Sequence, residues 1–522
     1  MAEPTPEPPE DLEPAELPAP GDEQPARPGR GRRAALLSLR LVAGAVATVA
    51  AAATVGAVGL LPLPTSGITP PSVEVTPVAA DEVRTCAGGA LRLGDETGAN
   101  ADTAVAIGIP AVRADAVNAS LQHGSISESD AGNGGSAAAP QVLRIASAEG
   151  ALLTGAQSQV VDASNFSGFS AAACAEPSGS IWLTGGATTV GRTSILTISN
   201  PTPVRALVSL TIYGEQGVIE APGLTGIDVA AGAQRVLSLA GFAPGLLSPV
   251  VHVEARGGQV VAYLQQSIVR GLDATGVDLV DAAPDPATEL VFPGVQIHDS
   301  LGTSRAMSLE DWDDVAPVVR ILNPGTEPAE VTVSVTPVDA EIAGTGFTAQ
   351  AEPGVVTELA LDSGADVDSG VALADGVYTV TVSSAAPVVA GVRTSAAADI
   401  GPVETEGIVP APPSDVAWYT AAPALGDLAL FTVPPGPAPV LATVNPTDAE
   451  LAVILKRLGN EEVTLTIPAG GAVTTALVAG ETYELQGATG LRAAVSYAAD
   501  EAMAAFPVTV ARPVSGPIVI RP

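Results

Sequence analysis

The sequence is short of the residues that most enzymes use for catalysis. Lys456 is the only lysine, aromatic residues make up 3% of the chain, and the three histidines are His123, His252 and His298. No histidines have the spacing of a zinc motif such as H-E-x-x-H, and one lysine gives little scope for serine–lysine catalysis. A G-x-S-x-G elbow and a G-K-[ST] phosphate loop are also missing. The common signatures of hydrolases and nucleotide-binding enzymes are therefore absent.

Basic charge is scarce as well. The chain has 22 lysines and arginines against 57 aspartates and glutamates, which gives a net charge of −35. A molecule this acidic repels phosphate backbones and anionic lipid headgroups, so nucleic acid is not expected as a partner. The same charge favours bound cations, including Ca²⁺.

One stretch is long, apolar and free of charge. It runs from Leu41 to Leu61 and follows five arginines that lie between Arg27 and Arg40. An apolar run of this length spans the roughly 30 Å hydrocarbon core as one helix. The positive-inside rule keeps the arginines cytoplasmic and places the C-terminal bulk outside the cell. We therefore expect a single-pass membrane anchor, and a slowly cleaved secretory signal is the alternative.

The chain has only two cysteines, Cys86 and Cys174, and both follow the apolar stretch. In an oxidising exterior we expect them to form a disulfide, which would contribute about 4–5 kcal/mol in the chain-entropy model. Two buried, unpaired thiols are the competing interpretation. No histidine is near either cysteine in the sequence, which argues against a catalytic thiol.

An internal repeat is the strongest signal beyond the apolar stretch. Asn200-Pro201, Asn323-Pro324 and Asn445-Pro446 are spaced 123 and 122 residues apart, and each follows an apolar run. Apolar residues alternate after each turn, at Ala206, Val208, Leu210 and Ile212, at Val331, Val333 and Val335, and at Leu451, Val453 and Leu455. Apolar residues that recur at every second position predict strands with one buried face. The Asn-Pro pairs predict a hairpin connection between strands.

These patterns predict an all-β exterior of tandem immunoglobulin-like antiparallel β-sandwich domains after a single N-terminal transmembrane helix. We expect the sandwiches to form a stalk. The predicted parts are a disordered Pro/Glu-rich cytoplasmic arm (1–33), the transmembrane helix (34–63), a Pro-rich spacer (64–83), a divergent β domain with the disulfide (84–178), and β-sandwich repeats 1 (179–285), 2 (286–410) and 3 (411–522). A polar loop from Gly124 to Ala139 lies in the divergent domain and is expected to be mobile, and in tandem sandwiches the loops in general usually carry recognition.

The three tryptophans, Trp182, Trp312 and Trp418, are near the starts of the repeats. An exposed tryptophan can stack on a sugar ring, so these residues are candidates for glycan binding. A tryptophan that fills a sandwich core or a domain junction is the competing and favoured interpretation.

Carboxylates are the only abundant reactive groups. Asp366 and Asp368 lie in a glycine-bounded loop and are weak candidates for Ca²⁺, and Glu310 to Asp314 places four acids around a tryptophan. Solvated acidic loops are the favoured interpretation of both. A pair of carboxylates could also hydrolyse a glycosidic bond, but acids are too common here to indicate it. No catalytic residue, cofactor or firm metal site is predicted.

A family resemblance rests on the segment Ile181-Trp-Leu-Thr-Gly-Gly-Ala-Thr-Thr-Val-Gly-Arg-Thr-Ser, on Ile198-Ser-Asn-Pro-Thr, on Leu210-Thr-Ile-Tyr-Gly and on Cys86-Ala-Gly-Gly. With the apolar stretch, these resemble an uncharacterised family of membrane-anchored, β-rich envelope proteins of high-GC Gram-positive bacteria, known only as a domain of unknown function. The resemblance implies a surface location and transfers no catalytic residue.

The prediction from sequence is a non-catalytic, membrane-anchored structural or interaction protein of the bacterial cell envelope. Its predicted partners are the membrane and an unidentified envelope protein or cell-wall glycan. A glycan-binding accessory protein of cell-wall assembly is the alternative, and an extracellular hydrolase is a third hypothesis with less support.

Overall fold

The computed structural model describes the chain in two separate units. The smaller unit contains one antiparallel pair of strands, β1 (Val73–Val75) and β35 (Ile518–Ile520). The described residues are 73–75, 81–94, 104–132, 135–148, 150–163, 166–362, 373–401, 411–460, 462–510 and 518–520. The predicted arm and transmembrane helix lie outside these ranges. No helix within them is long and apolar enough to cross a membrane.

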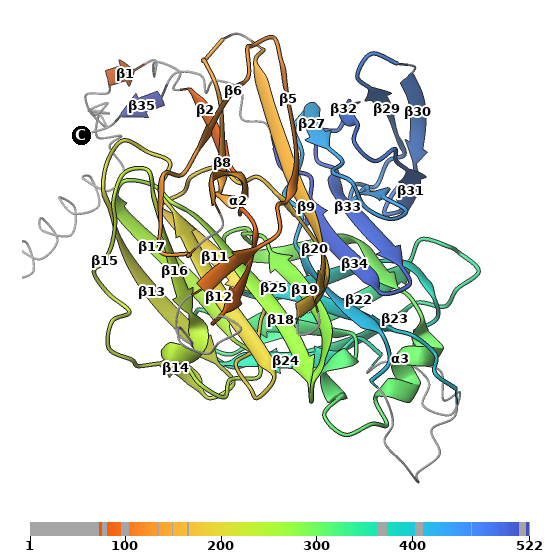
Figure 1. Ribbon diagram of the computed structural model, residues 1–522. Coiled ribbons are helices and arrows are strands. Elements are labelled where there is room, and N and C mark those ends of the chain that lie inside the picture. The colour runs from red at the N-terminus through yellow and green to blue at the C-terminus, as the bar shows by residue number, and fades with distance from the viewer. Residues whose placement is uncertain are drawn as a thin grey trace, which may run out of the picture. The chain divides into compact units, whose positions relative to one another are not determined.

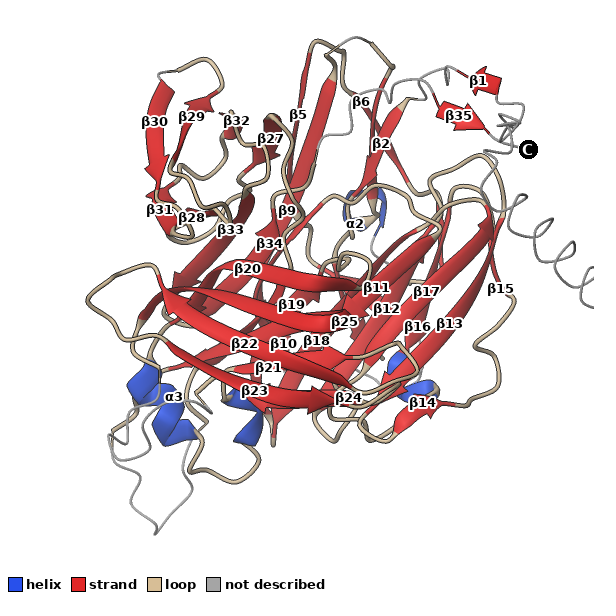
Figure 2. Cartoon of the chain, turned by 180° about the vertical axis from the view of Figure 1, so that it is seen from behind, coloured by secondary structure: helices blue, strands red, loops and turns tan. Residues whose placement is uncertain are grey.

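The larger unit is all-β, as predicted, and its sheets are almost entirely antiparallel (Figures 1 and 2). The strands of the first repeat are β11 (Ser180–Thr184), β12 (Arg192–Ser199), β13 (Ala206–Gly214), β14 (Gly217–Ile219), β15 (Ile227–Val229), β16 (Ala233–Ser238), β17 (Val250–Gly257), β18 (Val261–Arg270) and β19 (Asp273–Val280). They form two sheets. One has the order β11–β17–β13, with β14 and β15 both on β13, and the other has the order β19–β18–β12–β16.

The second repeat has the same order of strands. Its strands are β20 (Ala287–Ile297), β21 (Val318–Leu322), β22 (Ala329–Pro337), β23 (Thr345–Ala351), β24 (Val356–Ala360), β25 (Gly376–Ala397) and β26 (Ser414–Thr420). The first half of β25 pairs with β20 and β22, and its second half pairs with β21 and β26. One long strand therefore belongs to both sheets. Because β26 pairs with β25, the second repeat continues past the predicted boundary at residue 410.

The third repeat again follows this order. Its strands are β27 (Leu428–Thr432), β28 (Val440–Val444), β29 (Leu451–Arg457), β30 (Glu462–Ile467), β31 (Ala472–Ala476), β32 (Thr482–Gln486), β33 (Arg492–Ala499) and β34 (Ala502–Pro507). The sheets are β27–β32–β29–β30 and β34–β33–β28–β31. With strands lettered A to H along the chain, every repeat has one sheet in the order A–F–C–D and one in the order H–G–B–E. In each repeat, apolar side chains of both sheets meet in one buried cluster.

This connectivity differs from that of an immunoglobulin domain, whose sheets are ABED and CFG, at strands A, D and G, because D here pairs with C and not with E. In immunoglobulin domains strand G lies beside F in the CFG sheet. Here G pairs with B in the opposite sheet, as β18 does with β12. The A strand of each repeat takes the free place beside F, as β11 does beside β17.

The residues before the first repeat form a fourth, shortened copy. Its strands are β2 (Glu82–Thr85), β3 (Ala90–Leu93), β4 (Ala104–Ile107), β5 (Ala111–Val117), β6 (Gln122–Ser125), β7 (Glu128–Ser129), β8 (Gln141–Ile145), β9 (Leu152–Ala163) and β10 (Phe166–Ala173). The sheets β2–β8–β6 and β10–β9–β5 correspond to A–F–C and H–G–B. We call this copy the leading module. Its β7 pairs in parallel with β16 of the first repeat.

Helices are few and short among the described residues. They are α2 (Gly135–Ala138), α3 (Ser300–Ala306) and the 3-10 turns η1 (Leu239–Gly241) and η2 (Asp313–Val315). Two of them, α3 and η2, lie between strands A and B of the second repeat.

The Asn-Pro turns are corners between sheets, so the hairpin prediction is wrong. Strand B before each turn and strand C after it belong to different sheets, as β12 and β13 do. The asparagine side chain is buried at each corner. Asn323 donates from Nδ2 to the carbonyl oxygens of Glu327 (2.7 Å) and Ala351 (3.1 Å), and its Oδ1 accepts the N–H of Gly325 (2.9 Å). Asn200 and Asn445 make the equivalent bonds.

The four H strands, β10, β19, β26 and β34, pack against one another in a closed ring within the larger unit. The carboxyl group of Asp415 on β26 joins them, because its oxygens accept the backbone N–H groups of Phe169 (3.0 Å), Val277 (3.1 Å) and Met503 (3.0 Å). The approach is close: a Cβ at Gly168, whose φ is +147°, would lie 2.6 Å from the nitrogen of Val277. The ring covers four sheet edges at once, and residues 76–517 form one compact unit in place of the expected stalk.

Candidate functional site

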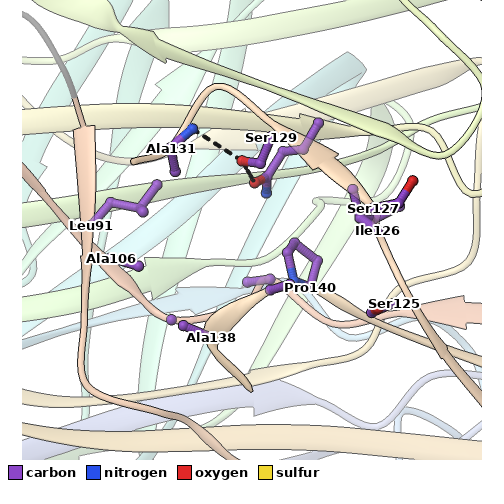
Figure 3. Close-up of a pocket in the computed structure, with 13 residues that line it drawn as sticks. Leu91, Ala106, Ser125, Ile126, Ser127, Ser129, Ala131, Ala138 and Pro140 are labelled. Carbon is purple, nitrogen blue, oxygen red and sulfur yellow. Dashed lines mark hydrogen bonds between the residues drawn. The ribbon is translucent and has the colours of Figure 1, made fainter. Parts of the chain in front are cut away.

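A pocket of about 340 Å³ opens where the leading module meets the first repeat (Figure 3). Much of its wall comes from Ser125 to Pro140, which includes most of the polar loop noted in the sequence. Ser129 on β7 donates to Oε1 of Gln234 on β16 (2.7 Å), and its oxygen accepts the N–H of Ala131 (3.1 Å). The opposite wall is the segment Ala87–Leu91. The parallel pairing of β7 with β16 therefore shapes the pocket.

Three buried glutamines fix the wall formed by Ala87–Leu91. Gln157 on β9 bonds both backbone groups of Gly88, with Oε1 accepting the N–H (3.0 Å) and Nε2 donating to the carbonyl (2.8 Å). Gln265 on β18 does the same for Leu91, at 2.7 and 2.6 Å. Gln159 accepts the N–H of Ala90 (2.9 Å). These side-chain amides make the backbone hydrogen bonds that a neighbouring strand would otherwise make. The wall is therefore held in place before any ligand binds.

The lining of the pocket is neutral. None of the described residues that line it is charged or aromatic, although Glu128 and Asp130 flank Ser129, and small side chains such as Ala106 leave room beside the serine hydroxyls. A phosphate or a cation would find no opposite charge here, and a sugar ring would find no indole to stack on. The site suits a small uncharged ligand that is recognised through hydrogen bonds.

The three tryptophans named as glycan candidates are buried, with 6%, 4% and 1% of Trp182, Trp312 and Trp418 exposed. Their faces are already covered. Trp182 stacks on His252 at 3.9 Å, Arg270 lies over Trp312 at 4.3 Å, and Arg320 lies over Trp418 at 4.5 Å. They pack at junctions between sheets, as the favoured interpretation had it, and no indole face is open to a sugar.

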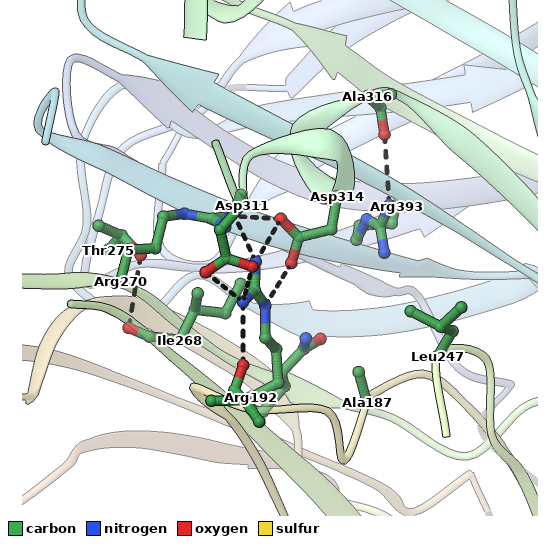
Figure 4. Close-up of polar contacts among 12 residues, drawn as sticks. Ala187, Arg192, Leu247, Ile268, Arg270, Thr275, Asp311, Asp314, Ala316 and Arg393 are labelled. Atoms are coloured by element: carbon green, nitrogen blue, oxygen red, sulfur yellow. Dashed lines mark hydrogen bonds and ion pairs between the residues drawn. The ribbon is translucent and has the colours of Figure 1, made fainter. Parts of the chain in front are cut away.

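The acidic segment from Glu310 to Asp314 is held by two arginines of the first repeat (Figure 4). Arg192 contacts Asp311 at 2.7 Å and Asp314 at 2.9 Å, and Arg270 contacts Asp314 at 2.6 Å. Burial works against the charged form of Asp314, but the Arg192 hydrogen bond and the Arg270 charge hold its pKa below the usual value. Asp311 and Asp314 therefore join two repeats through arginine partners, whereas Glu310 and Asp313 of the same segment are exposed. The other calcium candidates, Asp366 and Asp368, lie outside the described residues.

Cys86 and Cys174 form a disulfide with a sulfur–sulfur distance of 2.04 Å. It lies between β2 and β10, beside the buried side chains of Leu143 and Leu153. The disulfide therefore links the two sheets of the leading module, next to the pocket-forming segment that begins at Ala87.

One nucleophile–base pair was not foreseen from the sequence. Ser180 Oγ and His252 Nε2 are 2.9 Å apart, across neighbouring strands β11 and β17. Burial lowers the pKa of His252, although Glu254 and Asp285 oppose this effect. A catalytic triad also needs a group that orients the histidine, and among the described residues nothing hydrogen-bonds its Nδ1. The register of two strands that lie 70 residues apart in the chain could not be inferred from their separate sequences.

Comparison with known proteins gives one family. The model of a family described only as of unknown function (DUF5719) matches residues 126–479, which is more than half of the chain. The match begins within the pocket-forming loop and extends into the third repeat. No curated protein matches the chain.

Proposed function

The chain belongs to the DUF5719 family of unknown function, and we propose that it is a non-catalytic, membrane-anchored interaction protein of the bacterial cell envelope. In this proposal the four immunoglobulin-like modules are extracellular and the N-terminal arm is cytoplasmic. The apolar run after the arginines, the net charge of −35 and the disulfide support that location. The preference for alanine and arginine over lysine supports a high-GC Gram-positive source.

The neutral pocket is the observation that carries the interaction role. It combines a wall fixed by buried glutamines, a volume of about 340 Å³ and three serine hydroxyls, of which those of Ser127 and Ser129 also bond Gly232 and Gln234. That volume is near the lower end of the range for ligand sites in proteins, roughly 300–1,000 Å³. We infer that it receives an uncharged polar segment of a partner protein, while the ion-paired junctions elsewhere keep the modules in place.

A variant that fills the pocket tests this role. Ser127 is exposed and lines the pocket, so Ser127→Trp should block it without disturbing the core. Ser120→Trp, at an exposed serine outside the lining, is the matched control. After cross-linking on intact cells, we expect partners captured by the wild type and the control to be missing from Ser127→Trp. Equal capture by all three would remove the pocket from the proposal.

Glycan binding is a second candidate, and the hydroxyl-lined pocket is the observation that favours it. Serine hydroxyls and backbone groups can bond a sugar residue without an aromatic platform, and the buried tryptophans take no part. The full chain should then be retained on purified peptidoglycan or arabinogalactan, and Ser127→Trp should not be. Absence of retention for the wild type would leave a protein partner as the sole candidate.

The proposal also predicts that Ser180 is not a nucleophile, despite its contact with His252. A fluorophosphonate probe, which forms a covalent bond with activated serines, should not label the purified chain above the level of a Ser180→Ala variant. Labelling of the wild type that disappears in Ser180→Ala would contradict the non-catalytic role and favour the hydrolase hypothesis.

A further inference from the structure

Three metal-ligating groups that are far apart in the sequence meet at the junction of the second and third repeats. His298 and Asp299 directly follow β20, and Asp500 lies in the turn between β33 and β34. His298 Nε2 is 3.8 Å from Asp299 Oδ2 and 3.4 Å from Asp500 Oδ1. One ligand atom from each of the three residues lies within 4.8 Å of the others.

These separations are compatible with coordination of one ion. His298 Nε2 and Asp500 Oδ1 are within hydrogen-bond reach of each other at 3.4 Å, which is longer than the roughly 2.7–2.9 Å of a charge-assisted N–H···O bond. Around a tetrahedral ion with bonds of about 2.0–2.2 Å, neighbouring ligand atoms are about 3.3–3.6 Å apart. The His298–Asp500 distance falls in that range, and a small rotation of Asp299 would bring it there too.

The negative charge around His298 also favours a bound cation. Among the described residues, neither Asp299 nor Asp500 pairs with an arginine or lysine, and His298 is the sole basic partner of both. Asp375 and Asp399 add further negative charge close to Asp299. The nearby Arg305 is already paired with Asp399. A divalent ion would supply the missing positive charge.

His298 and Asp299 directly follow a strand, Asp500 lies in a surface turn, and all three groups are open to solution. The backbone N–H of Ser300 donates to Asp375 (2.8 Å), which fixes the chain just after Asp299. The side chains of His298 and Asp299 are about one third exposed, and that of Asp500 is 89% exposed. An ion can therefore reach the site without any opening of the fold.

We propose that His298, Asp299 and Asp500 bind one zinc ion, with water in the fourth position. An imidazole with two carboxylates is a donor set that suits zinc, whereas Ca²⁺ and Mg²⁺ favour oxygen ligands alone. The ion links the end of β20 in the second repeat to the β33–β34 turn in the third. This site is separate from the neutral pocket, so the proposal does not depend on the proposed function.

Calorimetric titration tests the site. The full-length chain, without a polyhistidine tag and freed of metal with a chelator, is titrated with Zn²⁺. We expect one site per chain in the wild type, no measurable binding in His298→Ala, and weaker binding in Asp500→Asn. His123→Ala is the matched control, because His123 is exposed and has no acidic partner in the described structure, and it should bind as the wild type does. A tenfold excess of Ca²⁺ should not displace the zinc.

Two results would overturn the zinc proposal. One is the absence of binding by the wild type, and the other is binding that persists unchanged in His298→Ala. Unfolding midpoints measured for each metal-free variant separate a lost ligand from a lost fold. A change at this surface turn should leave the midpoint of the metal-free chain where it is.

Discussion

At the scale of single residues, buried polar groups that reach across modules hold the larger unit together. Asp415 accepts backbone N–H groups from the leading module, the first repeat and the third repeat. Arg320, which is fully buried, contacts Glu358 at 2.8 Å and donates to the carbonyl oxygens of Gly186 and Pro249. Each such group would be costly to bury alone, so its partners fix where the modules meet.

Replacement of Asp415 by asparagine should destabilise the fold. An amide nitrogen cannot accept a hydrogen bond, so at least one of the three N–H donors would lose its partner inside the core. We expect a loss of about 3 kcal/mol in the free energy of unfolding, measured by urea denaturation. Asp448→Asn, at an exposed aspartate, should change it by about 0.5 kcal/mol or less. Equal stability of the two variants would show that Asp415 does not join the H strands.

Asp415 should also make stability depend on pH. Burial raises its pKa to about 8, against the opposing effect of the N–H groups it accepts. Because the folded chain then holds a proton that the unfolded chain releases near pH 4, this residue's contribution is complete below pH 4 and is lost as pH rises toward 8. The difference in unfolding free energy between wild type and Asp415→Asn should therefore shrink as pH rises through that window. A difference independent of pH would contradict this.

Residue roles were the part of the site least open to prediction from sequence. The tryptophans could be recognised as either core or stacking residues, and their burial decides between the two. His298 and Asp500 are 202 residues apart, and no spacing rule connects ligands that meet only after two repeats have packed. The same holds for the glutamines of the pocket wall, since Gln265 reaches Leu91 across 174 residues.

At the scale of strands, the alternation of apolar and polar residues was sufficient to predict which segments form strands with one buried face. The alternation of Val331, Val333 and Val335 predicted a strand with one buried face, and β22 has buried and exposed residues in strict alternation. The same alternation could not show which of the two sheets each strand joins. The Asn-Pro turns have the composition of a hairpin, but their buried asparagine turns the chain from strand B to strand C of the opposite sheet.

The corner asparagine should matter for stability. Asn323→Ala removes two donated hydrogen bonds and one accepted bond from a fully buried corner. We expect a loss of about 2 kcal/mol in unfolding free energy, because buried backbone carbonyls are left without partners. Asn460→Ala, at an exposed asparagine in the third repeat, is the control and should have little effect. Equal results for both in thermal denaturation would mean that the turn is fixed by proline alone.

At the scale of the whole molecule, three repeats could be recognised in the sequence, but the leading module as a fourth copy and the arrangement of the copies could not. Repeats spaced by 123 and 122 residues are compatible with a rod or with a cluster. The ring of H strands decides in favour of a cluster within the larger unit, and it depends on contacts among β10, β19, β26 and β34 that no local pattern encodes. The leading module closes the ring and contributes the pocket.

The disulfide should stabilise the leading module and, through the ring, the rest of the unit. Its cysteines are 88 residues apart, so the chain-entropy model predicts that Cys86→Ser with Cys174→Ser lowers the unfolding free energy by about 4–5 kcal/mol. The same shift should follow treatment of the wild type with a reductant, and the double variant should not respond to that treatment. A wild type that denatures at the same urea concentration with and without reductant would count against this role.

The extracellular location can be tested with the chain's single lysine. Lys456 lies on β29 in the third repeat and is partly exposed. An amine-reactive reagent that cannot cross membranes, applied to intact cells, should modify the Lys456 peptide as fully as it does after lysis, while a cytoplasmic marker protein stays unmodified. Modification of Lys456 only after the cells are permeabilised would contradict the proposed topology and, with it, the role at the cell surface.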